Sequence, residues 1–326
     1  MKMITSPSNE ERYRISPIRV LSASSPVTLL EFSNDGTRLL AGCDDGTLSI
    51  WNTRSWKREA SQSLGSTIQW IVESSSEYLI QTREGALFMN PHLKTFSLNP
   101  KDSCTHLGFC KAHLNGQVLA APHNEADVWV RTLHAPNRSL THIVTLEKGS
   151  SGMICALKII ALGKRLLATY EIGKIILWDL EGSHEQLHCL DILQSAWALD
   201  WDPVCSSGLL SGPAKEVVSF KLNDSSDQLR LLKSRSLPTE GISDIKIRSR
   251  PKHKLAIASS WDGTLRLFSW AFPSKLKALG ALKFHTEALN CLAASRVPIK
   301  VEGKEVFLFA GGSKDERISL WNVYNE

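Results

Sequence analysis

Four side chains that could bind zinc lie within ten residues, in the segment CTHLGFCKAH. They are Cys104, His106, Cys110 and His113. A structural zinc site needs pairs of ligands at defined spacings, and this segment does not contain such pairs. A free cysteine more often behaves as a small buried apolar side chain. We therefore predict no metal here and assign the segment to a packed strand.

Other candidate catalytic groups also lack the setting that their chemistry requires. His188 and Cys189 are adjacent, but no glycine-framed turn or helix accompanies them as it would a nucleophile. The sequence GGSK, which ends at Lys314, does not have the spacing of a phosphate-binding loop. GSSG, which begins at Gly149, is not a nucleophile elbow. The sequence predicts no catalytic residue and no cofactor, so we do not expect an enzyme.

The composition is that of an ordinary globular protein. The chain has 326 residues, of which 42% are hydrophobic and 22% charged. Its seven cysteines are scattered along apolar runs, which favours reduced thiols and a cytoplasmic or nuclear location. Residues 1–12 contain no apolar core of signal-peptide length and are expected to be a disordered tail. No apolar run is long enough to cross a membrane without interruption by charge.

Five basic residues lie in the segment from Lys246 to Lys254, KIRSRPKHK, and account for most of the net charge of +5. Ile245 and Ile247 alternate with Lys246 and Arg248, which is typical of a half-buried strand with one solvated face. A localisation signal or a patch for an acidic partner is the other interpretation. A nucleic-acid binder would show a wider basic stripe with aromatic residues, so no nucleic-acid partner is expected.

Four segments of the chain resemble one another. They run from Leu39 to Asn52, Leu166 to Asp179, Ala256 to Ser269 and Phe309 to Asn322. Each reads as an apolar strand, a short turn ending in Asp-Gly or a substitute, and a strand ending on an aromatic residue. Glycine suits such turns because it adopts positive φ without steric penalty. Weaker copies, which make seven units in all, run from Glu77 to Asn90, Gly116 to Val130 and Gly208 to Lys221.

Another apolar stretch precedes each unit and would supply an inner strand. These stretches begin at Pro26, Thr67, Thr105, Met153, Ala196, Ile242 and Ala288. From Trp51 to Trp321, six repeats span 270 residues, so the period is 45 residues. That period with a Trp-Asp ending is typical of WD repeats. The predicted fold is therefore all-β, a seven-bladed WD-repeat β-propeller.

The last repeat is one strand short, because only five residues follow Trp321. The segment from Ser16 to Ala23 precedes the first inner strand and belongs to no repeat. We expect it to pair with the last blade and close the ring, since an open sheet edge favours aggregation. Residues 13–326 would then form a single propeller.

WD repeats often carry a buried hydrogen-bond chain of histidine, aspartate and tryptophan. In the last repeat the matching positions are His285, Asp315 and Trp321. The other repeats have no equivalent histidine, so their aromatic anchors, among them Trp51 and Trp178, are expected to act mainly through packing.

The last third of the chain resembles one particular WD-repeat family. The stretches LAIASSWDGTLRLFSW, LKFHTEALNCLAA and AGGSKDERISLWNVY are similar to the family of guanine-nucleotide-binding protein β-subunit-like protein 1, which includes the WD subunit of the fungal ASTRA assembly. The resemblance is weaker in the repeats between Thr67 and Val130 and in the one that ends at Lys221. It implies an adaptor that acts with the TTT cochaperone assembly in the maturation of phosphatidylinositol-3-kinase-related kinases. Such a protein would be a monomer within a larger complex.

Two other functions remain open at the level of sequence. IWNTR, from Ile50 to Arg54, is close to the Trp-Asp-x-Arg box of cullin-RING ubiquitin-ligase receptors, but Asn52 interrupts it. A generic WD-repeat scaffold is a further alternative. A heterotrimeric G-protein β subunit is disfavoured, since the residues before Pro17 show no heptad for a coiled coil.

The turns in the middle of the last two repeats are the predicted contact surface for partners. Trp261 lies in the turn SSWDG, where a small or polar residue is usual, and Lys314, Glu316 and Arg317 lie in the matching turn of the next repeat. An exposed tryptophan beside charged side chains is typical of a binding hot spot. The alternative is that Trp261 only covers a neighbouring residue.

Overall fold

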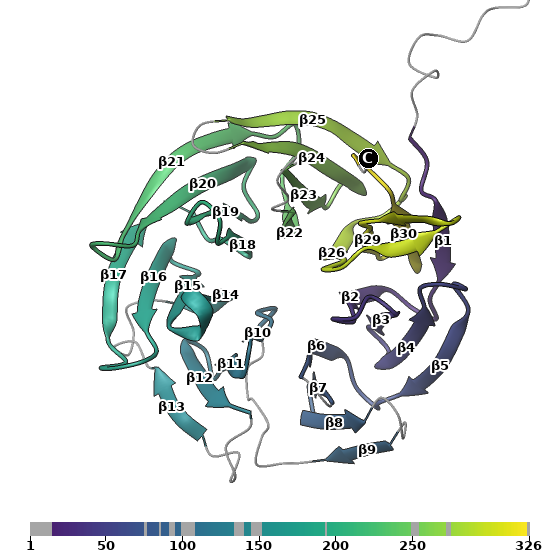
Figure 1. The fold of residues 1–326 in the computed structure, drawn as a ribbon, viewed down its shortest axis with the longest axis horizontal. Coiled ribbons are helices and arrows are strands. Elements are labelled where there is room, and N and C mark those ends of the chain that lie inside the picture. The colour runs from purple at the N-terminus through teal and green to yellow at the C-terminus, as the bar shows by residue number, and fades with distance from the viewer. Residues whose placement is uncertain are drawn as a thin grey trace, which may run out of the picture.

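The computed structural model describes residues 15–324, except for 75–76, 85, 91–94, 99–107, 134–139, 145–151, 193, 249–253 and 272–274. The predicted tail of residues 1–12 lies outside this range. The described residues form seven four-stranded antiparallel sheets and one two-stranded sheet. The seven larger sheets are arranged radially around a centre, as in a β-propeller (Figure 1). The prediction of an all-β WD-repeat propeller is confirmed.

The sheets are numbered here in chain order, each from its inner to its outer strand. Sheet 1 contains β2 (Val27–Phe32), β3 (Arg38–Cys43), β4 (Thr47–Asn52) and β5 (Arg58–Ser63). Sheet 2 contains β6 (Ile68–Glu73), β7 (Tyr78–Thr82), β8 (Ala86–Asn90) and β9 (Thr95–Leu98). Sheet 3 contains β10 (His113–Asn115), β11 (Val118–His123), β12 (Asp127–Thr132) and β13 (Leu140–Val144).

The next three sheets follow the same order. Sheet 4 contains β14 (Ile154–Ile160), β15 (Arg165–Tyr170), β16 (Lys174–Asp179) and β17 (Gln186–Asp191). Sheet 5 contains β18 (Ala198–Asp202), β19 (Ser207–Ser211), β20 (Glu216–Asn223) and β21 (Gln228–Ser236). Sheet 6 contains β22 (Ile242–Arg248), β23 (Leu255–Ser260), β24 (Thr264–Ala271) and β25 (Lys275–Lys283). A short 3-10 helix, η3 (Ala161–Gly163), joins β14 to β15.

Sheet 7 takes strands from both ends of the described chain. It contains β26 (Leu289–Ala294), β29 (Phe309–Ser313), β30 (Arg317–Trp321) and, as its outer strand, β1 (Arg19–Ser22). β1 runs antiparallel to β30, with Leu21 opposite Ile318. A small hairpin of β27 (Ile299–Val301) and β28 (Lys304–Val306) is inserted between β26 and β29.

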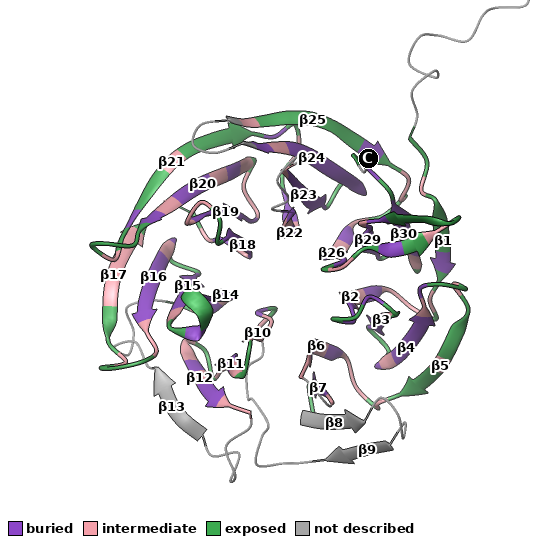
Figure 2. Ribbon diagram, in the orientation of Figure 1, coloured by how far each residue is buried: buried purple, intermediate pink, exposed green. Residues whose placement is uncertain are grey.

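The apolar side chains of the described residues form seven buried clusters, and each cluster lies between two neighbouring sheets. One of them joins sheet 7 to sheet 1 and includes Leu21 from β1 with Leu30 and Leu320. Burial follows this plan, because the strands next to the centre are largely buried while β5, β21 and β25 are largely exposed (Figure 2). Stability therefore comes from contacts between the faces of adjacent sheets rather than from one central core.

The sharp turns between second and third strands need glycine at two well-defined positions. Gly46 and Gly263 have φ of 80° and 76°, and a Cβ atom there would lie 2.6 Å from the Ser66 carbonyl oxygen and 2.7 Å from the His285 carbonyl oxygen. Both the left-handed backbone and the close approach therefore exclude a side chain. This is the physical basis of the Asp-Gly pattern in the sequence.

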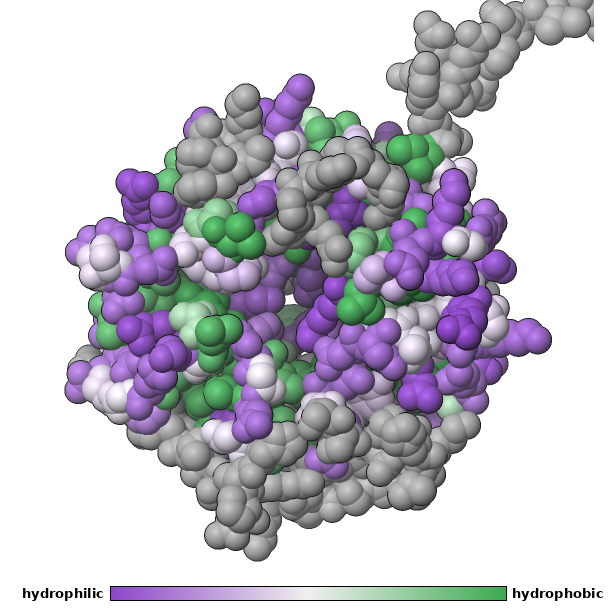
Figure 3. Space-filling model, in the orientation of Figure 1, coloured by the Kyte–Doolittle hydropathy of each residue, from purple (hydrophilic) through white to green (hydrophobic). Residues whose placement is uncertain are grey.

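These turns lie at the same end of the sheets as the loops that enter the inner strands. The backbone N–H of Trp261 donates to the carbonyl of Gly241, and that of Lys314 donates to the carbonyl of Ala288, at 3.0 and 2.9 Å. We call this side of the ring the turn face. The opposite side, which carries η3, faces the viewer in Figures 1 to 3, and hydrophobic and hydrophilic residues are mixed across it.

One predicted inner strand is in the wrong place. The stretch beginning at Thr105 was expected to be the inner strand of the third sheet, but that strand is β10, His113–Asn115. Gly108 and Phe109 form a bend, and Thr105 lies outside the described residues. The six other predicted inner strands coincide with β2, β6, β14, β18, β22 and β26. No helix among the described residues is long and apolar enough to span a membrane.

Candidate partner-binding site

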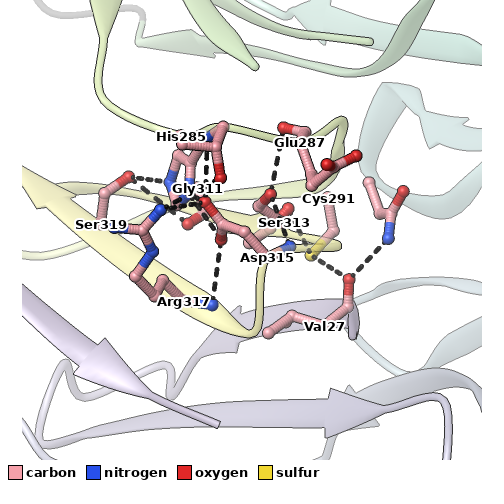
Figure 4. A network of polar contacts seen from close by, with 12 residues as sticks. Val27, His285, Glu287, Cys291, Gly311, Ser313, Asp315, Arg317 and Ser319 are labelled. Atoms are coloured by element: carbon pink, nitrogen blue, oxygen red, sulfur yellow. Dashed lines mark hydrogen bonds and ion pairs between the residues drawn. The ribbon is translucent and has the colours of Figure 1, made fainter. Parts of the chain in front are cut away.

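A chain of hydrogen bonds ties the turn of sheet 7 to its strands (Figure 4). The Nδ1 atom of His285 lies 3.0 Å from both carboxylate oxygens of Asp315, and its Nε2 atom lies 2.8 Å from the Ser319 hydroxyl. The indole N–H of Trp321 donates to the same hydroxyl at 2.8 Å. His285, Asp315 and Trp321 thus lie in one chain, with Ser319 as the link between histidine and tryptophan that the sequence analysis did not identify.

The electrostatics of this chain favour a neutral histidine beside an ionised aspartate. Burial lowers the pKa of His285, although Asp315 acts in the opposite direction. Burial would raise the pKa of Asp315, but its hydrogen bond and charge interaction with His285 and the N–H of Thr286 hold that pKa below its ordinary value. With one ring nitrogen donating to a carboxylate and the other facing a hydroxyl, His285 is held in one orientation.

Sheet 6 fills the same positions with a different set of groups. Arg266 takes the position of Ser319, and its guanidinium donates to the carboxylate of Asp262 and to the hydroxyl of Thr239. The side chain of Arg266 is only 10% exposed, so this ion pair is largely shielded from water. An arginine-aspartate pair therefore joins the turn to the entering loop here, as the histidine chain does in sheet 7.

The other two aromatic anchors act through burial. Trp51 is 8% exposed and packs in the cluster between sheets 7 and 1, and Trp178 is 5% exposed and packs between sheets 3 and 4. The guanidinium of Arg58 lies 5.6 Å from the centre of the Trp51 ring. Among the described residues no histidine forms a hydrogen bond to either indole, although sheet 1 has a serine, Ser49, at the position of Ser319. Sheet 4 has Ile176 at that position.

Trp261 forms part of a row of three aromatic rings on the turn face. It is 41% exposed, and its ring centre lies 5.8 Å from that of Trp197, which precedes β18. Trp197 in turn stacks on Phe109 at 6.0 Å, and Phe109 is 82% exposed. We call these three residues the aromatic row. Phe109 and Trp197 were missed because both had been assigned to inner strands, and only their contact in space shows that they belong together.

Trp261 also covers its neighbour, as the alternative interpretation held. A Cβ atom at Gly241 would lie 2.0 Å from Cδ2 of Trp261, so the indole rests directly on the glycine backbone. This support fixes one face of the ring and leaves the remainder exposed. The geometry is compatible with both a covering role and a contact role.

The three charged residues of the neighbouring turn are not equivalent. Lys314 and Glu316 are exposed, and Glu316 has a φ of 64° at the position that Gly263 occupies in sheet 6. Arg317 instead donates to Asp315 at 2.8 Å, and its guanidinium lies 4.9 Å from the ring centre of Phe284. Lys314 and Glu316 are therefore available to a partner, while Arg317 holds the turn together.

The basic segment does not form a solvated face. Lys246 lies 3.2 Å from the carboxylate of Asp244, and Lys254 lies 3.5 Å from that of Asp202. Arg248 is buried and donates to the carbonyl oxygens of Val323 and Tyr324. The alternation of isoleucine and basic residues correctly predicted a strand, but that strand, β22, is an inner strand. Its second side therefore meets the centre of the ring and other segments rather than open water, and Arg250 and Lys252 lie outside the described residues.

Only two of the four residues of the rejected zinc motif, Cys110 and His113, lie in the described part of the chain. Cys104 and His106 lie outside the described residues. Cys110 is buried, and burial raises the pKa of its thiol. His113 accepts a hydrogen bond from the N–H of Ile159 at 3.1 Å through Nδ1. Across the described part of the chain, no group of three or more histidine, cysteine, aspartate or glutamate residues is placed to hold a metal ion.

Comparison with known proteins defines the class. A family model described as "WD domain, G-beta repeat" matches residues 15–52, which contain β1 to β4. The fold matches a chain in a solved structure titled "Crystal Structure of Mitotic Checkpoint Complex" with a TM-score of 0.75, at 16% identity, over 100% of this chain and 97% of that one. At this identity the likeness shows the fold alone. The chain is a WD-repeat β-propeller protein.

Within this class, two curated proteins are similar in sequence. Guanine nucleotide-binding protein subunit beta-like protein 1 of Mus musculus is 28% identical over 311 residues, which cover 88% of this chain and 87% of the relative. ASTRA-associated protein 1 of Schizosaccharomyces japonicus is 37% identical over 78 residues, which cover 24% of this chain and 18% of the relative. The predicted resemblance to this WD-repeat family is confirmed.

Proposed function

We propose that the protein is a non-enzymatic adaptor that acts with the TTT cochaperone assembly in the maturation and stability of phosphatidylinositol-3-kinase-related kinases. The observation that carries the proposal is the similarity to the β-like protein 1 over 88% of the chain, together with the ASTRA-associated relative, whose name links that relative to an assembly. WD-repeat propellers generally act as scaffolds for protein contacts, although a fold alone does not determine a function. The adaptor would work as a monomer within a larger complex, in the cytoplasm, the nucleus or both.

The turn face carries the best-supported contact surface for this role. Trp261 is supported by Gly241 on one side and exposed on the other, and Lys314 and Glu316 are exposed in the next turn. A rigid aromatic ring gives a large contact area at little entropic cost, which is why tryptophan is enriched among hot-spot residues. Arg317 contributes by fixing the turn that presents Lys314 and Glu316.

The state of the polar side chains supports an adaptor rather than an enzyme. His285 lies between Asp315 and Ser319, but its side chain is only 1% exposed and Ser319 is fully buried, so a substrate does not reach this histidine as it would a general base. Burial raises the pKa of Cys155 to about 12 and that of Cys205 to about 11, so both remain thiols near neutral pH. A thiol is a far weaker nucleophile than a thiolate.

The ubiquitin-ligase interpretation gains no support from the residues of its motif. The side-chain oxygen of Asn52 accepts hydrogen bonds from the backbone N–H groups of Arg54 and Ser55, at 3.0 and 2.9 Å. Asn52 therefore has a local role in the turn after β4. This explains its presence without a partner, and the cullin-RING receptor stays an alternative that experiment can distinguish.

Affinity purification of the tagged protein with quantitative mass spectrometry tests the proposal. We expect cochaperone subunits and large kinases of this family to be enriched over a tag-only control. The matched control is an unrelated WD-repeat propeller carrying the same tag. Recovery of a cullin adaptor without cochaperone subunits would replace the proposal with the ubiquitin-ligase alternative.

A further inference from the structure

Two lysines share one carboxylate beside the aromatic row. The Nζ atom of Lys111 lies 2.9 Å from Oδ2 of Asp244, and that of Lys246 lies 3.2 Å from Oδ1. Burial would raise the pKa of Asp244, but these two positive charges lower it to about 2. Asp244 is therefore fully ionised, and the group as a whole keeps one positive charge in excess.

Neighbouring acidic groups do not remove that excess. The charges of Asp200 and Glu31 also act on Lys246. Each of these carboxylates has a basic partner of its own, because Asp200 lies 2.6 Å from Nζ of Lys158 and Glu31 lies 3.2 Å from the guanidinium of Arg296. Each ammonium group has three N–H donors, and the Asp244 carboxylate satisfies only part of them. In a partly buried site, where the effective dielectric constant is low, a second carboxylate would be attracted more strongly than at an open surface.

The lysine pair and the aromatic row are linked at two places in the structure. Phe109 and Lys111 are two residues apart in the segment that leads into β10. Trp261 rests on Gly241, which directly precedes β22, and β22 carries Asp244 and Lys246. The stacking of Phe109 on Trp197 and the ion pair of Lys111 with Asp244 therefore tie the aromatic row and the lysine pair to the same short segment before β10.

We propose that the aromatic row and the Lys111–Lys246 pair together bind a short acidic segment of a partner protein that carries an aromatic or large aliphatic anchor. The anchor would pack on Phe109, which is 82% exposed, and on Trp261. A flanking carboxylate would take the spare N–H donors of the two lysines. The inference deepens the proposed adaptor function by naming the chemistry of the segment that the turn face recognises.

A single-stranded nucleic acid is the rival ligand, because bases stack on aromatic rings and phosphates bind lysine. Such binding sites normally have a basic groove that follows several nucleotides. Here the cationic group is compact and already shares an aspartate between two lysines. One or two carboxylates match that charge better than a continuous row of phosphates.

Fluorescence anisotropy with defined probes tests the proposal. The probe is a fluorescein-labelled decapeptide with two phenylalanines flanked by glutamates. Matched decapeptides carry glutamine or lysine in place of glutamate, and a labelled decauridine tests the rival ligand. We expect the glutamate peptide to bind most tightly and its affinity to fall as salt is added, because the attraction is partly ionic. Three results would overturn the proposal. They are equal binding of the glutamate and glutamine peptides, no binding of either peptide, and binding of decauridine alone.

Substitutions in the protein then locate the site. Phe109→Ala and Lys111→Gln should each weaken the glutamate peptide by about tenfold or more, as expected for an anchor and a charge partner. Lys111→Gln should also reduce the salt dependence. Leu162→Ala is the matched control, because Leu162 is 91% exposed on the opposite face. The peptide site would be wrongly placed if Phe109→Ala and Lys111→Gln both kept the wild-type affinity and the wild-type melting temperature.

The peptide-binding test and the test of the proposed adaptor function can give different results. Capture of cochaperone subunits by a protein that does not bind the peptide would retain the adaptor and remove this recognition site. Peptide binding that depends on Phe109 and Lys111, without any cochaperone capture, would retain the recognition site and remove the adaptor.

Discussion

Lys111 and Asp244 form an ion pair of 2.9 Å that joins the segment before β10 to β22. The two residues are 133 positions apart in the sequence. Lys111 lies in the segment that leads into sheet 3 and Asp244 lies in sheet 6, and these two sheets are not neighbours in the ring. Most contacts in a propeller join adjacent sheets, so this pair is a connection of a different kind. It fixes the segment that carries Phe109 over the inner strands on the turn face.

Removal of the Asp244 charge should destabilise the protein. Asp244→Asn leaves the ammonium groups of Lys111 and Lys246 together without a compensating anion, and breaking a buried pair in this way typically costs about 3 kcal/mol. Glu181→Gln is the control, because the exposed Glu181–Lys164 pair should contribute less than about 1 kcal/mol. Urea unfolding measures the loss of stability in both variants. Equal losses in Asp244→Asn and Glu181→Gln would show that the Lys111–Asp244 pair has no special role.

Ser319 in sheet 7 should contribute more to the free energy of unfolding than its counterpart in sheet 1, Ser49. Ser319→Ala removes the partner of both His285 Nε2 and the Trp321 indole, and leaving buried polar groups without partners costs about 1–3 kcal/mol. Ser49 is equally buried at the matching position, but among the described residues the one side-chain partner of its hydroxyl is the Ser61 hydroxyl, at 3.4 Å. Ser49→Ala should therefore cost clearly less free energy of unfolding. The reverse order would contradict the role given to the hydrogen-bond chain.

Acid should destabilise the protein partly through its buried histidines. Burial, and then the charge of Lys158, keep the pKa of His113 well below its ordinary value of 6.5 in the folded state. The unfolded chain binds a proton there as the pH falls through 6.5, while the folded chain does not. The stabilising contribution is therefore complete above that pH and is lost on acidification, by up to about 1.4 kcal/mol per pH unit for each such histidine.

Substitution of that histidine separates its share of the pH dependence. In His113→Asn, a side-chain amide oxygen can accept the hydrogen bond from Ile159 N–H without titrating. Its free energy of unfolding should depend less steeply on pH below 6.5 than that of wild type, whatever its absolute stability. Burial also lowers the pKa of His285, so a smaller dependence of the same sign should persist. If the free energy of unfolding changed equally steeply with pH in the wild-type protein and in His113→Asn, His113 would be excluded as a source of the acid sensitivity.

The N-terminal strand should be needed for a soluble ring. Deletion of residues 1–22 removes β1 and exposes the edge of β30, so we expect aggregation in size-exclusion chromatography. A finer test compares two neighbours on β1. Leu21 is 4% exposed in the cluster between sheets 7 and 1, and Leu21→Ala should cost about 3 kcal/mol. Val20 is 38% exposed, so Val20→Ala should be nearly neutral. A deletion variant that melts like wild type would refute this role.

The repeats and most strands could be predicted because their signals are local. Alternating apolar residues and Asp-Gly turns such as that at Gly263 are determined within a few residues, and the same pattern recurs along the chain. β10 could not be located, because three residues are too short for a visible period. The β27–β28 hairpin is an insertion, and the other sheets have no counterpart of it within the residues that the structure describes, so the repeat gave no indication of it.

The site was only partly predictable for a related reason. Trp261 stood out because it occupies a turn position that is usually small or polar. Phe109 and Trp197 gave no such signal, since each looks like an ordinary residue of an apolar strand until the fold brings them within 6.0 Å. Arg317 was assigned to a partner from its place in a charged turn, but its pairing with Asp315 is visible only in three dimensions. Contacts between segments that are distant in the chain could not be predicted from this single sequence.

The adaptor function is best tested by direct binding of the purified protein to purified TTT cochaperone subunits, measured by size-exclusion chromatography with light scattering. We expect the wild-type protein to co-elute with the subunits and the double variant Trp261→Ala with Lys314→Glu to lose co-elution. Both changes are at exposed turn-face residues and leave Arg317 paired with Asp315. Leu162→Ala on the opposite face should co-elute as wild type does. Failure of the wild-type protein to co-elute would contradict the adaptor function, and full co-elution of a folded double variant would place the contact away from the turn face.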